Sequence, residues 1–186
     1  MPKTTTITKE MIINSAFEIV REEGFYNISA RKIAKKIGCS TQPIYWVYKS
    51  MDDLIRDVVN KVVSYLSEML RNYKKSGKPF LDYGLGYVYI AHAEPVFFKA
   101  IYVDNILRLK MTEIIPEKEM LDLMKQDSCC ENIPNEKLFE IATNAWLFAH
   151  GMASLIASEM LVYDEENVEK MLELFMGNMP NEQSYL

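Results

Sequence analysis

The chain has few of the residues that hold small secreted domains or metal centres together. It contains three cysteines, Cys39, Cys129 and Cys130, in 186 residues. Three cysteines do not make a disulfide framework, and two adjacent ones are poorly spaced for a bridge or for joint metal ligation. We expect three reduced thiols, with a redox switch at Cys129–Cys130 as the alternative. The two histidines, His92 and His150, have neither ligand spacing nor an orienting third group, so we expect no catalytic site, metal or cofactor.

Long apolar segments are also absent. The first ten residues, MPKTTTITKE, have no apolar stretch after the basic residue, which argues against a signal peptide. The most apolar run, Ile141 to Ile156, contains Asn144 and His150 and is too short to cross a bilayer. The sequence therefore predicts a cytoplasmic protein without a membrane partner.

Net charge is −5, which argues against nucleic acid until its distribution is considered. Residues 1–60 hold nine Lys/Arg and seven Asp/Glu, whereas residues 61–186 hold twelve and nineteen. Between Glu23 and Asp52 there is no acidic residue, and the basic residues there are Arg31, Lys32, Lys35, Lys36 and Lys49. A basic head on an acidic body is typical of a DNA-binding module joined to a part that does not touch DNA.

No segment alternates apolar and polar residues with the period of a strand, and glycines and prolines stand where helices begin or end. The sequence predicts an all-α protein. The expected helices, about nine, cover residues 8–23, 29–37, 40–48, 51–73, 79–93, 95–110, 117–128, 135–161 and 165–176.

The segment from Ser29 to Tyr48 has the pattern of a helix-turn-helix. Two short helical stretches are joined by the turn Ile37-Gly38-Cys39 and follow a stabilising first helix. Pro43 is compatible with the second helix only in its first turn, where the missing N–H is not needed.

Residues 24–54 resemble the DNA-binding domain of the tetracycline-repressor family without a gap. The matching positions are Ser29, Ile33-Ala34, Gly38-Cys39-Ser40, Ile44-Tyr45, Tyr48, Ser50 and Leu54. The resemblance implies a three-helix DNA-binding domain at 1–49 and a ligand-sensing and dimerisation domain at 50–186. It further implies a homodimeric repressor that binds a palindromic operator and responds to a small-molecule effector.

Roles for individual residues follow from the same resemblance. It implies that Ser29 binds a phosphate at a helix N-terminus and that Arg31 reads a guanine edge. Thr41, Gln42 and Pro43 open the recognition helix and would face bases. The remaining expected phosphate contacts are Tyr45, Trp46 and Lys49.

Alternatives remain open for four of the residues in or beside this motif. Tyr45 and Trp46 would instead pack against the first helix, and Lys35 and Lys36 are better read as a solvated face than as base readers.

Two positions depart from the family pattern. Met51 stands where the family usually has Lys, and Val47 where a His or an aromatic residue is common. Because both are typical phosphate contacts, we expect a weaker salt dependence of DNA binding, with Lys49 compensating in part for Met51.

The two C-terminal helices are the expected dimer surface. Residues 141–156 are apolar nearly all round, which predicts burial on two sides, one against the same chain and one against a partner. Gly151, Ala153 and Ala157 would allow close approach; the alternative is a core helix of a monomer. The expected interface residues are Phe148, Gly151, Met152, Leu155, Met171, Leu174 and Phe175.

The segment Trp146 to Gly151 resembles the Trp…His-Gly signature of a C-terminal regulatory domain found in part of that family. Aromatic side chains with polar atoms mark the expected effector pocket, with plain core packing as the alternative. Gly84 and Gly86 would leave space beside them. Apolar or cationic compounds are the expected effectors. The pocket residues are Tyr83, Tyr87, His92, Phe97, Phe98, Tyr102, Trp146 and His150.

Two other function classes compete with this hypothesis, an enzyme and a helical interaction module without DNA binding. In the preferred mechanism the ligand shifts the population between two states that differ in the separation of the recognition helices. The helix that begins after Ser50 would transmit the change, and relief of repression by the ligand is the expected direction.

Overall fold

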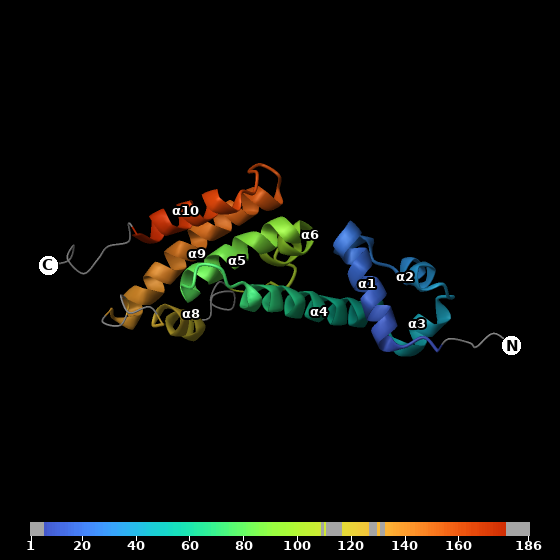
Figure 1. Ribbon diagram of the computed structural model, residues 1–186. Helices are drawn as coiled ribbons and strands as arrows, with labels where there is room; N and C mark the ends of the chain where they lie inside the picture. Colours follow the sequence, from blue (N-terminus) through green and yellow to red (C-terminus); the bar gives the residue numbers. More distant parts are fainter. Residues whose placement is uncertain (1–5, 109, 111–116, 127–129, 131–132, 178–186) are drawn as a thin grey trace. The chain divides into compact units, whose positions relative to one another are not determined.

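The computed structural model describes residues 6–108, 110, 117–126, 130 and 133–177. Within these residues the chain forms nine α-helices with short 3₁₀ and π segments and no strand (Figure 1). The all-α prediction is therefore confirmed. Contacts divide the chain into two compact units, Met1–Leu66 and Ser67–Leu186.

The N-terminal unit consists of three short helices and the first part of a long one. They are α1 (Lys9–Glu23), the 3₁₀ turn η1 (Phe25–Asn27), α2 (Ala30–Ile37), α3 (Gln42–Val47) and α4 (Met51–Asn72). Because the division between the units falls inside α4, the compact unit extends beyond residue 49. The predicted functional boundary at residues 49 and 50 stays a prediction.

Side-chain caps and glycines set the ends of these helices. Thr8 Oγ1 accepts a hydrogen bond from the Met11 amide at 3.2 Å, and Ser29 Oγ accepts one from the Lys32 amide at 3.3 Å. Gly38 ends α2 in the left-handed region at φ 82°, a conformation that a side chain would strain. These caps fix where α1 and α2 begin and where the chain turns toward α3.

A capping interaction also begins α4. The Asp53 amide donates to Ser50 Oγ at 3.2 Å, and the Ser50 hydroxyl donates to Asp53 Oδ2 at 2.8 Å. The arrangement satisfies one of the amides left unpaired at the helix start. Leu54 and Val58 of this helix are fully buried in the N-terminal unit.

The C-terminal unit is a helical bundle in which α5 packs along α9 (Figure 1). Helix α8 packs on both of them, and α10 packs on the same pair. The bounds are α5 (Pro79–Ala93), α6 (Pro95–Phe98), the π turn η2 (Lys99–Val103), α8 (Glu117–Met124), α9 (Asn135–Ala157) and α10 (Glu165–Gly177).

Asp82 fixes the start of α5. Its carboxylate is almost fully buried and accepts hydrogen bonds from the Lys75 amide (3.1 Å), the Ser76 amide (2.7 Å) and the Ser76 hydroxyl (2.8 Å). Burial acts to raise the pKa of Asp82, but these hydrogen bonds outweigh it and hold the pKa below its usual value. The ionised carboxylate thereby anchors the connection between α4 and α5.

Three helices are shorter in the structure than the sequence predicts. The helix expected over 95–110 is wrong beyond Val103, because the chain turns at Asn105 and Arg108, which have φ of 47° and 54°. The helix expected to reach residue 161 ends at Ala157, followed by Glu159 at φ 59°. Tertiary packing, which single-sequence periodicity does not contain, decides these ends.

The helix expected over 117–128 ends at Met124, and its predicted last two residues lie outside the described residues, as does Cys129. The hypothesis of a redox switch at Cys129–Cys130 is therefore not addressed by the structure. Within the described ranges, no helix is both long and apolar enough to cross a membrane.

Candidate functional site

Helix α3 is held by two side chains and exposes the rest. Ile44 is fully buried and Tyr48 nearly so, whereas Tyr45 and Trp46 are 55% and 75% exposed. The alternative that Tyr45 and Trp46 pack against the first helix is therefore wrong. Their spacing explains the difference, because positions 44 and 48 lie one helical turn apart on the inner face and 45 and 46 lie on the outer one.

The predicted base contacts and the predicted phosphate contact Ser29 lie on the same motif. Thr41 and Gln42 are exposed, Pro43 is partly exposed in the first turn, and Arg31 is exposed on α2. Ser29 is half-buried and caps α2 through its oxygen, which leaves its hydroxyl proton available to donate. The structure thus presents a polar edge at the start of α3 and a helix N-terminus on α2.

A polar triad locks the end of α3 to α1 and α4. The Tyr48 hydroxyl donates to Asp57 Oδ2 at 2.9 Å, and Lys9 Nζ lies 2.7 Å from the same oxygen. Two hydrogen bonds lower the pKa of Asp57, the larger effect coming from Lys9 and the smaller one from Tyr48. The sequence analysis missed this triad, since its members are separated by up to 48 positions and meet only in the folded unit.

Two lysines of the basic cluster are neutralised by α1. Lys32 Nζ forms an ion pair with Glu23, and Lys36 Nζ lies 3.2 Å from a Glu22 oxygen. Arg31, Lys35 and Lys49 are exposed. The cluster therefore presents less positive charge than the sequence suggests, because the acidic end of α1 lies beside α2.

In the C-terminal unit, Tyr87 lies at the centre of an aromatic cluster. Its ring centroid is 5.4 Å from that of Phe98, 5.2 Å from Tyr102 and 6.1 Å from Trp146. His150 stacks on Trp146 at 4.8 Å. Five of the eight residues proposed from the sequence for the pocket thus meet in one place.

The polar atoms of this cluster pair with each other. The Tyr87 hydroxyl and His150 Nδ1 share a hydrogen bond of 2.9 Å, and Ser154 Oγ lies 3.4 Å from His150 Nε2. Burial lowers the pKa of His150 and raises that of Tyr87, so both groups are held neutral near pH 7. These hydrogen bonds orient the imidazole and the phenol toward each other.

His92 does not join this cluster. Its ring is exposed and stacks on Tyr163 at 4.2 Å, and Phe97 is fully buried core. Both residues were predicted for the pocket because they are aromatic, but the faces of the helices that carry them point away from the cluster. Among the described residues, no group of three or more His, Cys, Asp or Glu side chains is arranged to hold a metal ion.

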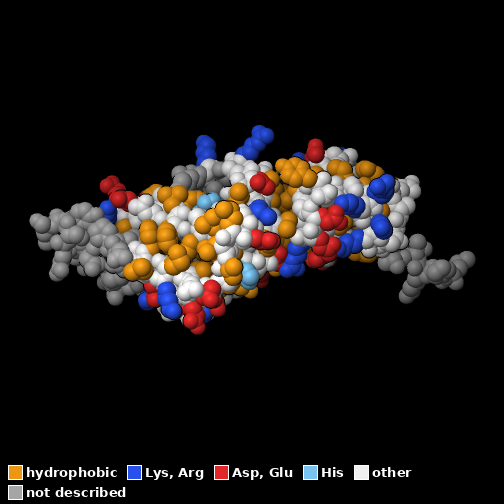
Figure 2. All heavy atoms as spheres, turned by 90° about the horizontal axis from the view of Figure 1, so that it is seen from above, with side chains coloured by type: hydrophobic (Ala, Val, Ile, Leu, Met, Phe, Trp, Pro, Cys, Tyr) orange, Lys and Arg blue, Asp and Glu red, His pale blue; other side chains and the backbone are white. Residues whose placement is uncertain are grey.

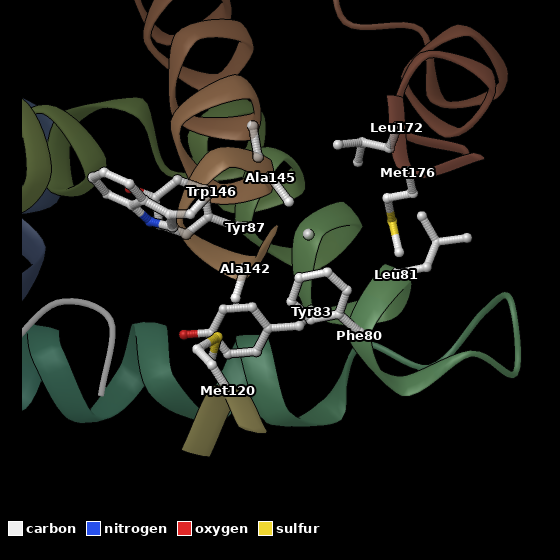
Figure 3. A pocket seen from close by; sticks show the side chains of 12 residues that line it. Phe80, Leu81, Tyr83, Tyr87, Met120, Ala142, Ala145, Trp146, Leu172 and Met176 are labelled. Atoms are coloured by element: carbon white, nitrogen blue, oxygen red, sulfur yellow. The ribbon is translucent and has the colours of Figure 1, made fainter. Parts of the chain in front are cut away.

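A small cavity of about 20 Å³ lies beside the aromatic cluster, among α5, α8, α9 and α10 (Figure 3). Tyr83, Tyr87 and Trp146 of the predicted set line it. Sequence reasoning missed the others, since their apolar side chains look like ordinary core. These are Phe80, Leu81, Met120, Ala142, Ala145, Ala149, Leu172 and Met176, while Gly84, which was expected to leave space, also lines the cavity.

The two glycines expected to leave space in α5 have different surroundings. Gly84 lines the cavity, and a Cβ there would meet Leu172 at an ordinary 3.6 Å. A Cβ at Gly86 would lie 2.9 Å from Tyr73 Cβ and 3.1 Å from Leu70. Gly86 therefore permits close packing against the end of α4, and only Gly84 contributes to the cavity.

Most of the predicted dimer residues are accessible on α9 and α10. Leu155, Met171 and Leu174 are 42%, 43% and 67% exposed, and a Cβ at Gly151 would meet nothing within 4 Å. Phe148 and Phe175 stack on each other at 4.5 Å between the two helices. Figure 2 shows hydrophobic side chains gathered over the helices of the C-terminal unit.

Three small or flexible residues of α9 are not accessible to a partner. Met152, Ala153 and Ala157 are buried within their own chain. The expectation that Ala153 and Ala157 face a partner is wrong, because their Cβ atoms point into the bundle of the same chain. Met152, also predicted for the dimer interface, is buried in its own chain as well, so its side chain is not available to a partner.

Comparison with known proteins relates the N-terminal part to one family. Residues 12–58 match the family model described as bacterial regulatory proteins, tetR family. An HTH-type transcriptional repressor of Mycobacterium tuberculosis is 30% identical over 90 residues, in a match that covers 41% of this chain and 34% of that protein. The chain thus spans about a third of the length of the curated relative.

Solved structures extend the likeness in fold to nearly the whole chain. A TetR-like transcriptional regulator from Rhodococcus sp. RHA1 has a TM-score of 0.57 at 15% identity and covers 95% of this chain and 96% of its own. A regulator of the TetR/AcrR family from Thermobifida fusca has a TM-score of 0.58 at 20% identity, covering 92% and 98%. The N-terminal part of the chain is therefore similar to the tetR family of bacterial regulatory proteins, and the chain has the fold of TetR-like regulators.

Proposed function

We propose that the protein is a transcriptional repressor that binds a palindromic DNA operator as a homodimer and releases it when a small molecule binds the C-terminal unit. The observation that carries this proposal is the exposed edge of α3. Large aromatic side chains held at 55% and 75% exposure at the end of a helix-turn-helix gain little from water and fit a partner surface. The curated relative bears the name of a repressor.

In this proposal some residues of α2 and α3 contact bases and others contact phosphates. Thr41, Gln42 and Pro43 face base edges in the major groove, with Arg31 reaching a guanine. Phosphate contacts come from the N-cap of α2 and the outer face of α3, where an amide-rich helix start and aromatic and basic side chains meet the backbone. These residues are Ser29, Tyr45, Trp46 and Lys49.

The dimer would form through the accessible side of α9 and α10. Phe148, Gly151, Leu155, Met171 and Leu174 would pair with the same residues of a second copy in a four-helix contact, with Phe175 beside them. Gly151 supports this assignment: mid-helix glycine costs about 1 kcal/mol relative to alanine, and nothing in the same chain needs the space. Two-fold symmetry would place the recognition helices about 34 Å apart, one turn of DNA.

Ligand binding in the C-terminal unit would favour a state with another separation of the recognition helices. Helix α4 belongs to both compact units and is the element that would transmit the change. Such a repressor acts in the cytoplasm, where the operator lies.

The first experiment is selection of bound sequences from a random duplex library with the full chain, followed by a titration of the selected duplex at several salt concentrations. We expect a palindromic sequence and one dimer per site. Lys49→Ala should weaken binding to all sequences. The slope of the logarithm of the binding constant against the logarithm of the salt concentration should fall by about one per subunit, because one phosphate contact is lost. Lys118→Ala, an exposed lysine of α8, is the matched control and should leave both unchanged.

Gln42→Ala should instead relax the preference at one base position, because an amide contact to a base edge carries sequence information. A chain that gives no specific complex at low salt, or that is monomeric at the concentrations used, would rule out the proposal. The helical interaction module would then be the better reading.

A further inference from the structure

We infer that the effector is an uncharged compound with a flat aromatic ring, bound in an enlarged form of the cavity among α5, α8, α9 and α10. This inference rests on the proposed function in one respect, namely that the C-terminal unit takes an effector. It narrows the expectation from the sequence, which admitted cationic compounds equally.

The lining of the cavity excludes a charged ligand. All twelve residues that line it are apolar, aromatic or glycine, and none is an Asp, Glu, Lys, Arg or His (Figure 3). A buried cation or carboxylate without an opposite charge or several hydrogen bonds is strongly unfavourable. A neutral aromatic ring has no charge to desolvate, so the apolar walls favour it over an ion.

One polar atom of the cavity wall already has a partner inside the protein. Tyr87, which forms one wall, shares its hydroxyl with His150 Nδ1 at 2.9 Å. A ligand that needed this hydroxyl would have to break that hydrogen bond inside the protein, which costs more than it gains unless fully replaced. Tyr87 therefore contributes shape and contact area to ligand recognition rather than a hydrogen bond.

The arrangement of the walls favours a flat ring over a bulky cage. Ala142, Ala145 and Ala149 stand at one-turn spacing along α9 and give that side a smooth surface. Aromatic side chains of α5, Phe80 and Tyr83 among them, lie on the other side, and Figure 3 shows Ala142 and Ala145 pointing toward the enclosed space. A ring inserted here would contact methyl groups on one face and ring systems on the other.

At about 20 Å³ the cavity holds no more than a water-sized molecule, so the ligand must make room. Met120 of α8 and Met176 of α10 line it, and unbranched thioethers adopt new rotamers readily. Leu172 and Met176 lie on the cavity side of α10, while Met171 and Leu174 of the same helix are exposed on the predicted dimer face. A ligand that displaces α10 would thereby alter the dimer contact.

The test uses the fact that the chain has two tryptophans, one in the cavity wall and one on α3. In Trp46→Phe the fluorescence reports Trp146 alone. The probes are isopropylbenzene, its 4-carboxylate and its 4-trimethylammonium derivative, which share one ring and differ in charge. We expect isopropylbenzene to change the Trp146 emission and to bind at least about 100-fold more tightly than either ion.

Three variants locate the binding. Gly84→Ala adds one methyl group toward Leu172 without a clash, so it should raise the melting temperature and weaken binding several-fold. Asn144→Ala also favours helix, on an exposed position of α9 outside the cavity, and should leave binding unchanged. Met176→Ala enlarges the cavity and should tighten binding several-fold.

Equal or tighter binding of either ion would overturn the inference, as would the absence of any Trp146 response to isopropylbenzene. Insensitivity of binding to both Gly84→Ala and Met176→Ala would overturn it too, since the ring would then bind elsewhere. DNA binding is measured separately on the chain with Trp46 intact. A missing operator complex would count against the proposed function, while the fluorescence result would still decide the ligand class.

Discussion

In the N-terminal unit most of the residues predicted to be functional lie on the surface, whereas in the C-terminal unit the predicted pocket residues other than His92 are buried or half-buried. Gln42, Tyr45 and Trp46 are exposed, and the fold only has to hold the short helix that carries them. Tyr87 and Trp146, by contrast, are enclosed by other helices. A DNA-reading surface is built by leaving side chains unpacked, and a small-molecule site by packing them incompletely.

The largest expected effect separates the two units. Ile44→Ala removes the fully buried side chain that holds α3, at a cost of about 2–5 kcal/mol in the unfolding free energy. Operator binding should be lost, while the Trp146 fluorescence, measured in the Trp46→Phe background, and its response to isopropylbenzene persist. Simultaneous loss of the Trp146 signal would mean that the two units do not fold independently.

A smaller effect concerns the hydrogen bond inside the aromatic cluster. Tyr87→Phe removes the partner of His150 Nδ1 and should destabilise the chain by about 1 kcal/mol. Because a neutral ring does not use this hydroxyl, isopropylbenzene binding should change little. Thermal unfolding and fluorescence titration of the same variant check the two statements.

The cluster should also respond to pH. Burial lowers the pKa of His150 below its unfolded value near 6.5, so the unfolded chain takes up this proton first. The stabilising contribution is present above pH 6.5 and is lost as the pH falls toward the folded pKa. Melting curves between pH 7.5 and 5.5 should show this loss in the native chain and a smaller one in His150→Gln.

The triad that locks α3 gives the corresponding effect in the N-terminal unit. Asp57→Asn removes the ion pair with Lys9 and should destabilise this unit by about 1 kcal/mol, because a partly exposed pair adds little and the Tyr48 hydrogen bond persists in weaker form. With the pKa of Asp57 lowered, the contribution is present above the unfolded pKa and disappears as the pH falls through the folded one. Acid unfolding followed by circular dichroism checks this, and an unchanged acid profile in Asp57→Asn would contradict it.

The smallest expected effect tests the charge balance of the DNA-reading surface. Glu22→Gln combined with Glu23→Gln releases Lys36 and Lys32 from their ion pairs. Operator affinity should rise about two- to five-fold at low salt and the salt slope should steepen, because two more cations become available to phosphates. Glu140→Gln on α9, also in an exposed ion pair with a lysine, is the matched control.

Local signals predicted the helix-turn-helix well because each of them acts within a few residues. The caps at Thr8, Ser29 and Ser50 each act within three residues, and Gly38 takes the left-handed conformation that the turn needs. Exposure of positions 45 and 46 follows once Ile44 is placed inward. The ion pairs with Glu22 and Glu23 could not be predicted, since they join residues on two helices.

Prediction was poorer in the C-terminal unit, where residue type did not reveal direction. Tyr87 and His92 stand five positions apart on α5, yet the first enters the aromatic cluster and the second stacks on Tyr163 at the surface. Alanines of α9 looked suited to a partner, yet Ala153 packs into its own chain. Both outcomes depend on the rotation of a helix that is apolar on several sides.

The sequence by itself determined the all-α class, the position of the reading motif and the ends of its helices, because caps, glycines and helical periodicity act through neighbouring residues. Only the tertiary structure decided which aromatic residues gather around Tyr87, which lysines are neutralised and how little space the cavity holds. Those features arise from contacts between residues far apart in the chain, and a linear pattern does not record the rotation and spacing of packed helices.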